Sequence, residues 1–206
     1  MTKVKICGIT NLDDALLSAR LGADMLGFNF YQNSPRFIDP QSAALIGKAV
    51  NSKVKKIGVF VNEDAARVRE IAETAGLDAV QLHGDESPEY VTELAGIKVI
   101  KAFRLGGGFD PALIDEFGVD AILVDAYCAG EFGGTGKICD WIAAKGIRSR
   151  SSKMFLSGGL SADNIVDAIR AVAPYAVDAC SQLEAIKGKK DPAKLERFIA
   201  LAKQAR

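Results

Sequence analysis

Residues 4–30 read VKICGITNLDDALLSARLGADMLGFNF, and this stretch contains the repeating unit from which the fold is built. Residues 4–7 are a short apolar run typical of a buried strand, and residues 25–30 are a second one. Between them, residues 12–21 have the apolar spacing of an amphipathic helix. Because parallel strands need a crossover connection, usually a helix, the stretch predicts one β–α–β unit.

The same alternation continues along the rest of the chain. Further strands are predicted at residues 56–61, 79–82, 98–103, 121–125, 154–157 and 176–180. Capping residues and prolines indicate helix starts at Pro40, Asn62, Ser87, Asp110, Ser161 and Asp191. Residues 138–146 supply the remaining helix.

Eight strand–helix units in 206 residues leave about 26 residues for each unit, close to the minimum for a strand, a helix and two short loops. This count favours a single α/β domain over residues 1–206 that folds as a closed (β/α)8 TIM barrel. The alternative is a doubly wound open sheet, but such a sheet normally carries a GxGxxG turn after an early strand. Gly8 stands without that fingerprint.

The composition argues against several classes of partner. Lys plus Arg and Asp plus Glu number 26 each, so no overall charge attracts nucleic acid or an anionic membrane. The basic run at residues 187–190 is interpreted as a solvated surface. No stretch approaches the ~18–20 apolar residues of a membrane span, and the first ten residues lack the apolar core of a signal peptide. We therefore expect a cytoplasmic protein.

The numbers of cysteines and histidines limit the kinds of disulfide and metal site that the chain can form. Four scattered cysteines without a CxxC pair argue against a disulfide framework and against a zinc site. A single histidine makes a multi-histidine metal site impossible.

Reactive residues follow the predicted strands at their carboxyl ends, where the active site of a TIM barrel lies. Cys7 is either a small buried hydrophobe or a thiol that faces a cavity. Arg36 is either a surface residue or a planar fork for a carboxylate. His83 either packs at its strand end or acts as an acid or base.

Strand parity and glycine-rich loops add two more features. Parity turns four charged side chains toward the barrel interior, where they form either a structural ion network or part of a site: Lys5, Lys101, Asp125 and Asp178. Gly158 and Gly159 precede a helix start after the seventh strand, which suits either a phosphate or a plain tight turn. The glycine-dense loop at residues 130–136 is either a lid or a connection.

Six segments in order resemble the phosphoribosylanthranilate isomerase family of tryptophan biosynthesis: KICGIT at 5–10, SPRFI at 34–38, QLHGDE at 81–86, LVDA at 123–126, GGTGK at 133–137 and LSGGL at 156–160. With VDACSQLEAIKGKKD at 177–191 they cover almost the whole chain. The resemblance implies a (β/α)8 barrel, no cofactor, and a small phosphorylated substrate. The implied reaction is the Amadori rearrangement of N-(5-phosphoribosyl)anthranilate to the 1-deoxyribulose 5-phosphate.

The resemblance also implies roles for individual residues. It places the general base on Cys7, the general acid on Asp125 and a carboxylate-binding arginine on Arg36. The other substrate-binding residues that we predict, phosphate contacts among them, are Gly158, Gly159, Asp178, Ser181 and His83. We add the hypothesis that the Lys5 ammonium favours the thiolate of Cys7.

The chain departs from the family pattern at residues 178–184, which read DACSQLE where the family commonly has DVSSGVE. Cys180 replaces a hydroxyl by a weaker donor, and Gln182 adds a Cβ where a glycine lets backbone approach the phosphate. The alternatives are another phosphosugar isomerase or epimerase, a transferase similar to thiamine phosphate synthase, and a non-catalytic phosphosugar-binding barrel. We expect a monomer or a homodimer.

Overall fold

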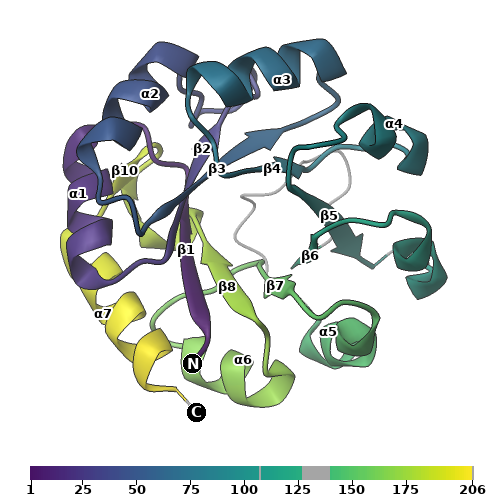
Figure 1. The fold of residues 1–206 in the computed structure, drawn as a ribbon. Coiled ribbons are helices and arrows are strands. Elements are labelled where there is room, and N and C mark those ends of the chain that lie inside the picture. The colour runs from purple at the N-terminus through teal and green to yellow at the C-terminus, as the bar shows by residue number, and fades with distance from the viewer. Residues whose placement is uncertain (107, 127–139, 206) are drawn as a thin grey trace.

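The computed structural model describes residues 1–106, 108–126 and 140–205. Eight parallel strands form a closed barrel in chain order, and the last strand pairs with the first (Figure 1). They are β1 (Lys3–Cys7), β2 (Met25–Asn29), β3 (Lys55–Phe60), β4 (Ala79–Leu82), β5 (Val99–Leu105), β6 (Ala121–Ala126), β7 (Met154–Leu156) and β8 (Ala176–Ala179). The predicted TIM barrel is confirmed, and each predicted strand overlaps an observed one.

Helices surround the barrel on its outer side (Figure 1). They are α1 (Leu12–Leu21), α2 (Pro40–Ala49), α3 (Ala65–Thr74), α4 (Pro88–Glu93), α5 (Trp141–Ile147), α6 (Ile165–Val172) and α7 (Pro192–Gln204). Short 3₁₀ segments are η1 (Pro111–Glu116), η2 (Arg148–Arg150) and η3 (Ser181–Leu183). The loop at residues 130–136 and the start of the helix predicted at 138–146 lie outside the described residues.

Three of the predicted helix starts differ from the structure. α3 is capped by Asp64 rather than Asn62, because the Asn62 side chain accepts a hydrogen bond from the loop after β4 instead. The segment after Asp110 is a 3₁₀ helix, not an α-helix. α6 begins only at Ile165, because the residues after Ser161 form turns first.

A two-stranded antiparallel hairpin, which the sequence analysis did not predict, lies between β8 and α7. It consists of β9 (Glu184–Ile186) and β10 (Lys189–Lys190). Lys190 is only 1% exposed, and its Nζ lies 3.4 Å from Glu184 Oε1 and 3.2 Å from the Cys180 carbonyl. The interpretation of residues 187–190 as a solvated surface is therefore wrong for Lys190. A strand alternates its side chains between two faces, and the inward face of β10 meets the barrel.

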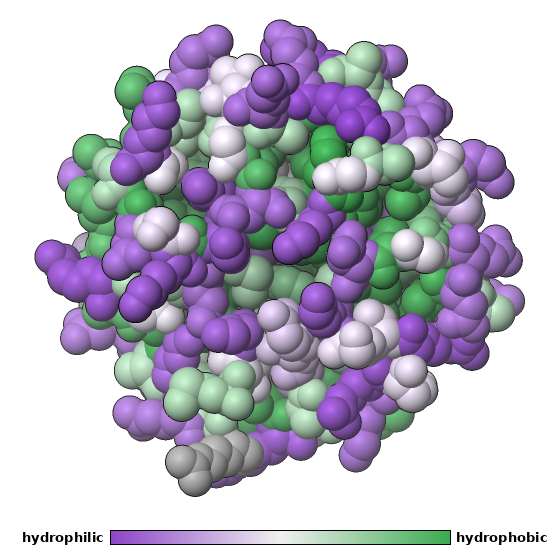
Figure 2. Space-filling model, viewed as in Figure 1, coloured by the Kyte–Doolittle hydropathy of each residue, from purple (hydrophilic) through white to green (hydrophobic). Residues whose placement is uncertain are grey.

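Apolar side chains fill the barrel in two layers. The larger layer lies between the strands and the surrounding helices. The smaller layer fills the interior of the barrel and consists of Met25, Ile57, Ala79, Ile100, Ala102, Ala121, Leu123, Phe155 and Ala176. Figure 2 shows hydrophilic side chains around the hollow at the centre of the barrel. The inner apolar layer comes from the first halves of most strands, and the buried charged side chains lie beside it, as Lys5 and Lys101 do, or beyond it toward the carboxyl ends, as Asp125 and Asp178 do. Among the described residues, no helix combines the length and the hydropathy that a membrane span requires.

Candidate active site

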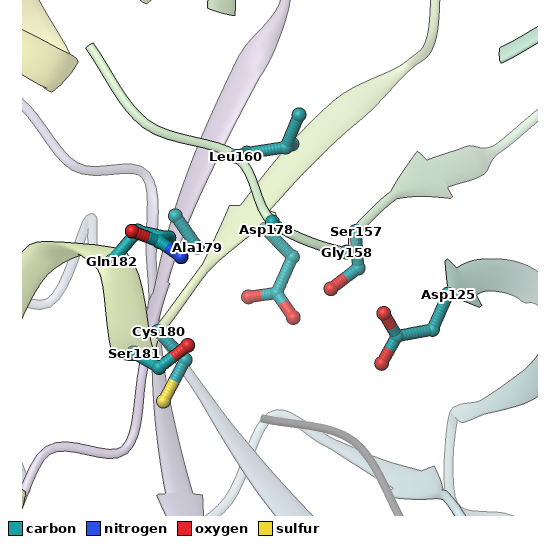
Figure 3. A pocket seen from close by; sticks show the side chains of 10 residues that line it. Asp125, Ser157, Gly158, Leu160, Asp178, Ala179, Cys180, Ser181 and Gln182 are labelled. Atoms are coloured by element: carbon teal, nitrogen blue, oxygen red, sulfur yellow. The ribbon is translucent and has the colours of Figure 1, made fainter. Parts of the chain in front are cut away.

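A pocket opens at the carboxyl ends of β6, β7 and β8. Its lining includes Asp125, Ser157, Asp178, Cys180 and Ser181. Figure 3 shows the carboxyl groups of Asp125 and Asp178 directed toward the same space as the Ser157 hydroxyl. Both carboxylates are about 95% buried. The pocket thus brings together residues from three strand ends that the sequence analysis had placed at one edge of the barrel.

Cys7 ends β1 and is held by its neighbours on both sides. In β2 it pairs with Gly27, where an added Cβ would lie 2.7 Å from the Cys7 Sγ. A side chain larger than that of glycine at position 27 therefore cannot coexist with the thiol in its present place. On the other side, the β1–β8 register places the thiol of Cys180 next to that of Cys7, close enough to affect its pKa.

Lys5 lies below Cys7 on the same face of β1 and is fully buried. Its Nζ donates to Asp178 Oδ1 at 3.0 Å and to Gln81 Oε1 at 2.9 Å. Burial alone would lower the pKa of Lys5, but the interactions with Asp178 and Cys7 together outweigh burial and raise it. Lys5 is therefore a permanent cation whose charge is matched by Asp178.

The pKa of Cys7 lies well above its usual value. The interaction with Cys180 raises it most, burial raises it further, and Lys5 acts in the opposite direction. The Lys5 ammonium thus favours the thiolate, as hypothesised, but its effect is outweighed. Lys5 does not by itself make Cys7 a thiolate.

Arg36 lies in the loop after β2 and is largely buried, with 8% of its surface exposed. Its Nε and Nη2 donate to the two carboxylate oxygens of Glu184 in the hairpin, at 2.7 and 2.8 Å. A guanidinium has five N–H donors, so this bidentate pair leaves three. The sequence analysis named Arg36 but missed Glu184, although it quoted the segment that contains it.

His83 faces two partners through its two ring nitrogens. Its Nδ1 lies 2.7 Å from Gln81 Nε2, and its Nε2 lies 3.3 Å from Asp125 Oδ2 without a well-aligned hydrogen bond. Lys5 has donors only, so Gln81 must accept from Lys5 through Oε1 and donate to His83 through Nε2. In the neutral ring the proton therefore lies on Nε2, on the side of Asp125.

The loop after β7 completes the pocket opposite Cys180. Gly158 and Gly159 have φ values of 92° and 62°, a region that only glycine adopts without strain. Asn164 fixes the end of this loop, because its side chain accepts from the Ser161 N–H and donates to the Gly159 carbonyl. Both glycines line the same pocket as Ser181, at the start of η3.

No group of three or more metal-ligating side chains occurs in the ranges 1–106, 108–126 and 140–205. The charged groups of the site are instead paired with one another, Lys5 with Asp178 and Arg36 with Glu184.

A model of the family described as N-(5'phosphoribosyl)anthranilate (PRA) isomerase matches residues 4–200. The chain belongs to this family. Among its relatives, the N-(5'-phosphoribosyl)anthranilate isomerases of Citrifermentans bemidjiense and Geobacter sp. strain M21 are 48% and 47% identical. The alignments cover 99% of this chain and 98% and 99% of those proteins.

Solved structures of the family agree with the barrel. Phosphoribosyl anthranilate isomerase from Thermotoga maritima has a TM-score of 0.92 at 41% identity, covering 98% of this chain and 99% of that one. The enzyme from Thermus thermophilus has a TM-score of 0.91 at 36% identity and full coverage of both chains. A further member, at 40% identity and a TM-score of 0.89, is in complex with reduced 1-(o-carboxyphenylamino)-1-deoxyribulose 5-phosphate, again covering 98% and 99%.

At residues 178–184 the chain departs from the common family pattern, and the structure shows where the two replaced residues lie. Cys180, where the family commonly has serine, lies beside Cys7 rather than away from it. Gln182 is exposed at the rim of the pocket. The proximity of Cys180 to Cys7 was missed at the sequence level, because it depends on the register between β1 and β8, in which Ile6 pairs with Ala179.

Proposed function

We propose that this chain catalyses the Amadori rearrangement of N-(5'-phosphoribosyl)anthranilate to 1-(2-carboxyphenylamino)-1-deoxyribulose 5-phosphate, a step of tryptophan biosynthesis. The observation that carries the proposal is the pocket, which joins Asp125, Cys180 and a glycine loop at one end of the barrel, with Cys7 next to Cys180 on the paired strand. These groups correspond to the three demands of the reaction. It needs a proton donor, a proton acceptor and a place for the phosphate.

Asp125 is the proposed general acid. Opening of the furanose ring needs a proton on the ring oxygen, which yields a Schiff base at C1. Asp125 is buried at the end of β6 and faces the pocket, and the His83 Nε2 lies beside its Oδ2.

Cys7 is the proposed general base. Its thiolate removes the proton from C2, and the electrons of the C–H bond form the double bond of an enolamine, which then becomes the ketone. Lys5 lies on the same face of β1 and keeps a positive charge near the sulfur. Removal of either Cys7 or Asp125 thus interrupts a different proton transfer of the same reaction.

Arg36 and the residues around β7 and β8 are the proposed binding groups. Glu184 fixes the plane of the Arg36 guanidinium, and the donors that Glu184 does not use bind the anthranilate carboxylate. Backbone N–H groups around Gly158, Gly159 and Ser181 hold the phosphate. Asp178 and His83 bind the sugar from the wall of the barrel.

We further propose that residues 1–206 form one domain that works in the cytoplasm as a monomer or a homodimer. The presence of a closed barrel over the described residues supports the first part. A relative from Thermotoga maritima at 40% identity is described as a dimeric phosphoribosylanthranilate isomerase from which monomers were generated. Sedimentation of the purified chain measures its state directly.

The test follows the decay of phosphoribosylanthranilate fluorescence with purified protein. The wild type should consume the substrate, and Cys7→Ser and Asp125→Asn should each lower kcat by about 10²-fold or more. Asp115→Asn, which changes an exposed carboxylate on η1, is the matched control and should retain full activity. A wild type that binds the reduced product analogue without turning over substrate would instead identify a phosphosugar-binding protein.

A further inference from the structure

Cys180 lies directly beside Cys7 at the mouth of the barrel. β1 and β8 are paired in register, with Ile6 opposite Ala179, so the next residue of each strand end is a cysteine. Gly8, at φ 71°, follows Cys7 and has no Cβ that would compete with its neighbours for space. A Cβ added there would lie 2.8 Å from both the Cys180 Sγ and the Arg36 Cδ. The Cys180 sulfur therefore packs between Cys7 and the Arg36 side chain.

Charged groups reach Cys180 from three other elements. Lys190 on β10 is fully buried, and its Nζ lies 3.8 Å from the Cys180 Sγ. Arg36 from the β2–α2 loop is the second cation, and Glu184 on β9 is the anion that both cations contact. The Cys180 sulfur thus faces two cations and one anion, Glu184, which pairs with both cations, whereas Lys5 beside Cys7 is a single cation paired with Asp178.

The two thiols differ in acidity in the direction that these charges predict. The pKa of Cys180 is lowered to about 7: the interaction with Cys7 lowers it most, Lys190 and Arg36 lower it as well, and burial and Glu184 act in the opposite direction. The pKa of Cys7 is raised by the same interaction. Two interacting thiols titrate as a pair, so the first apparent pKa describes the loss of one proton from the pair rather than from one of the two sulfurs.

We propose that Cys180 is a positioning residue for the base of the proposed isomerase: it shares one proton with Cys7 and carries the negative charge of the pair between Lys190 and Arg36. The inference rests on the proposed function, because it concerns how Cys7 becomes a thiolate. A serine at this position can donate a hydrogen bond to Cys7 but cannot accept its proton near neutral pH.

The proton balance of the step follows from this arrangement. The step starts from the form of the pair in which Cys7 carries the shared proton and Cys180 carries the negative charge. When the Schiff base is bound, the Cys7 proton passes to the Cys180 sulfur, and the Cys7 thiolate takes the proton from C2. The C–H electron pair becomes the C1–C2 double bond, and the C1–N double-bond electrons move to nitrogen. Both thiols then carry protons, and no other reactant is consumed.

The first experiment compares the wild type with Cys180→Ser over pH 5 to 10, in two measurements. Alkylation of the Cys7 peptide by iodoacetamide, read by mass spectrometry, reports the thiol without substrate. In the wild type the alkylation rate should begin to rise as Cys180 loses its proton, near its pKa of about 7, and in Cys180→Ser it should rise about one pH unit higher. The acidic limb of kcat/KM should move by the same amount. A serine variant with both profiles unchanged overturns the proposal.

A second comparison keeps both thiols in place. Lys190→Met removes the cation 3.8 Å from the Cys180 sulfur and should raise the apparent pKa of the pair. Lys190→Arg should restore it in large part, and Lys189→Met, at the exposed neighbouring position, should leave it unchanged. Equal shifts in Lys190→Met and Lys189→Met would show that the charge beside Cys180 is irrelevant, which contradicts the proposal.

The two proposals fail separately in these experiments. If the wild type shows no isomerase activity, the proposed function fails, and the alkylation profile still reports the thiol pair. If the wild type is active but Cys180→Ser alters neither profile, the function stands and the role of Cys180 falls. Circular dichroism of each variant confirms that the barrel is folded before either comparison is made.

Discussion

Two buried ion pairs at the same end of the barrel differ in what surrounds them. Lys101 in β5 binds Glu86 at 2.7 Å and the Gly84 carbonyl at 2.8 Å, and Glu86 also accepts from the backbone N–H groups of Asn62 and Gly84. Arg36 binds Glu184 with two of its five donors, beside the thiol of Cys180. The first pair is enclosed by backbone, whereas the second keeps unused donors near the pocket.

The difference separates a structural pair from a functional one. In the Lys101–Glu86 pair, backbone groups of two loops share the charge, so the pair joins the loops after β3 and β4 to β5. In the Arg36–Glu184 pair, one partner fixes the plane of a group that has further hydrogen bonds to give. We therefore expect mutations in the first pair to change stability and mutations in the second to change substrate binding.

The largest expected effect is on stability. Lys101→Met leaves the Glu86 carboxylate, which is 7% exposed, without its cation, and should lower the free energy of unfolding by about 3–5 kcal/mol. Urea denaturation followed by circular dichroism measures the loss. Lys98→Met, at an exposed position just before β5, is the control and should change little. A loss below about 1 kcal/mol would show that the enclosed pair is not structural.

The next effect concerns substrate binding. Glu184→Gln removes the charge that orients Arg36, and KM should rise by about 10- to 100-fold with a much smaller change in kcat. Steady-state kinetics on the fluorescent substrate separate the two constants. Glu196→Gln on the exposed face of α7 serves as the control. If instead only the free energy of unfolding changes, the two pairs have the same role, and the distinction drawn between them is wrong.

A smaller effect is expected from the contact between β4 and the acid. Gln81→Met removes the donor to His83 Nδ1, so the ring is no longer held with its proton on Nε2 beside Asp125. We expect kcat to fall about tenfold. His83 is the only histidine of the chain, so the ¹⁵N imidazole signals report its tautomer without assignment. Gln41→Met on α2 is the control; an unchanged tautomer in Gln81→Met would contradict the contact.

The smallest effect is a dependence of stability on acid pH. Burial would raise the pKa of Glu184, but the hydrogen bond from Arg36 and the charge of Lys190 lower it overall. Because the folded pKa lies below the usual 4.5, Glu184 stabilises the fold at higher pH, and this contribution disappears as the pH falls from there through the folded pKa. Urea midpoints between pH 3 and 6 should therefore decline less in Glu184→Gln than in the wild type.

The fold was predictable because its signals are local. Short apolar runs separated by capped, amphipathic segments define the strands and helices, and their number alone favours a closed barrel. Strand parity also placed Lys5 and Asp178 inside, where the structure finds them joined at 3.0 Å. The errors at Asn62 and Ser161 arose because side chains that resemble helix caps serve loop contacts instead.

The partners within the site were not predictable in the same way. Arg36 and Glu184 are 148 positions apart, and the hairpin that brings them together has no strong apolar pattern. Lys190 appeared to be one more surface lysine until the hairpin buried it. Cys180 was noted as a replaced serine, but its acidity depends on cations from two separate elements, the β2–α2 loop and β10. Long-range contacts of this kind are decided by the packing of the whole barrel.

The hairpin also links substrate binding to local unfolding. Glu184 and Gly188 are joined at 3.3 Å, and the Lys190 N–H binds Asp14 on α1 at 2.8 Å. When β9 and β10 open, Arg36 loses its partner and Cys180 loses a cation in the same event. A ligand that requires both groups therefore binds only the closed hairpin and holds it closed. The slowing of amide hydrogen exchange at residues 184–190 upon binding is thus a measure of affinity, reported by a segment outside the barrel.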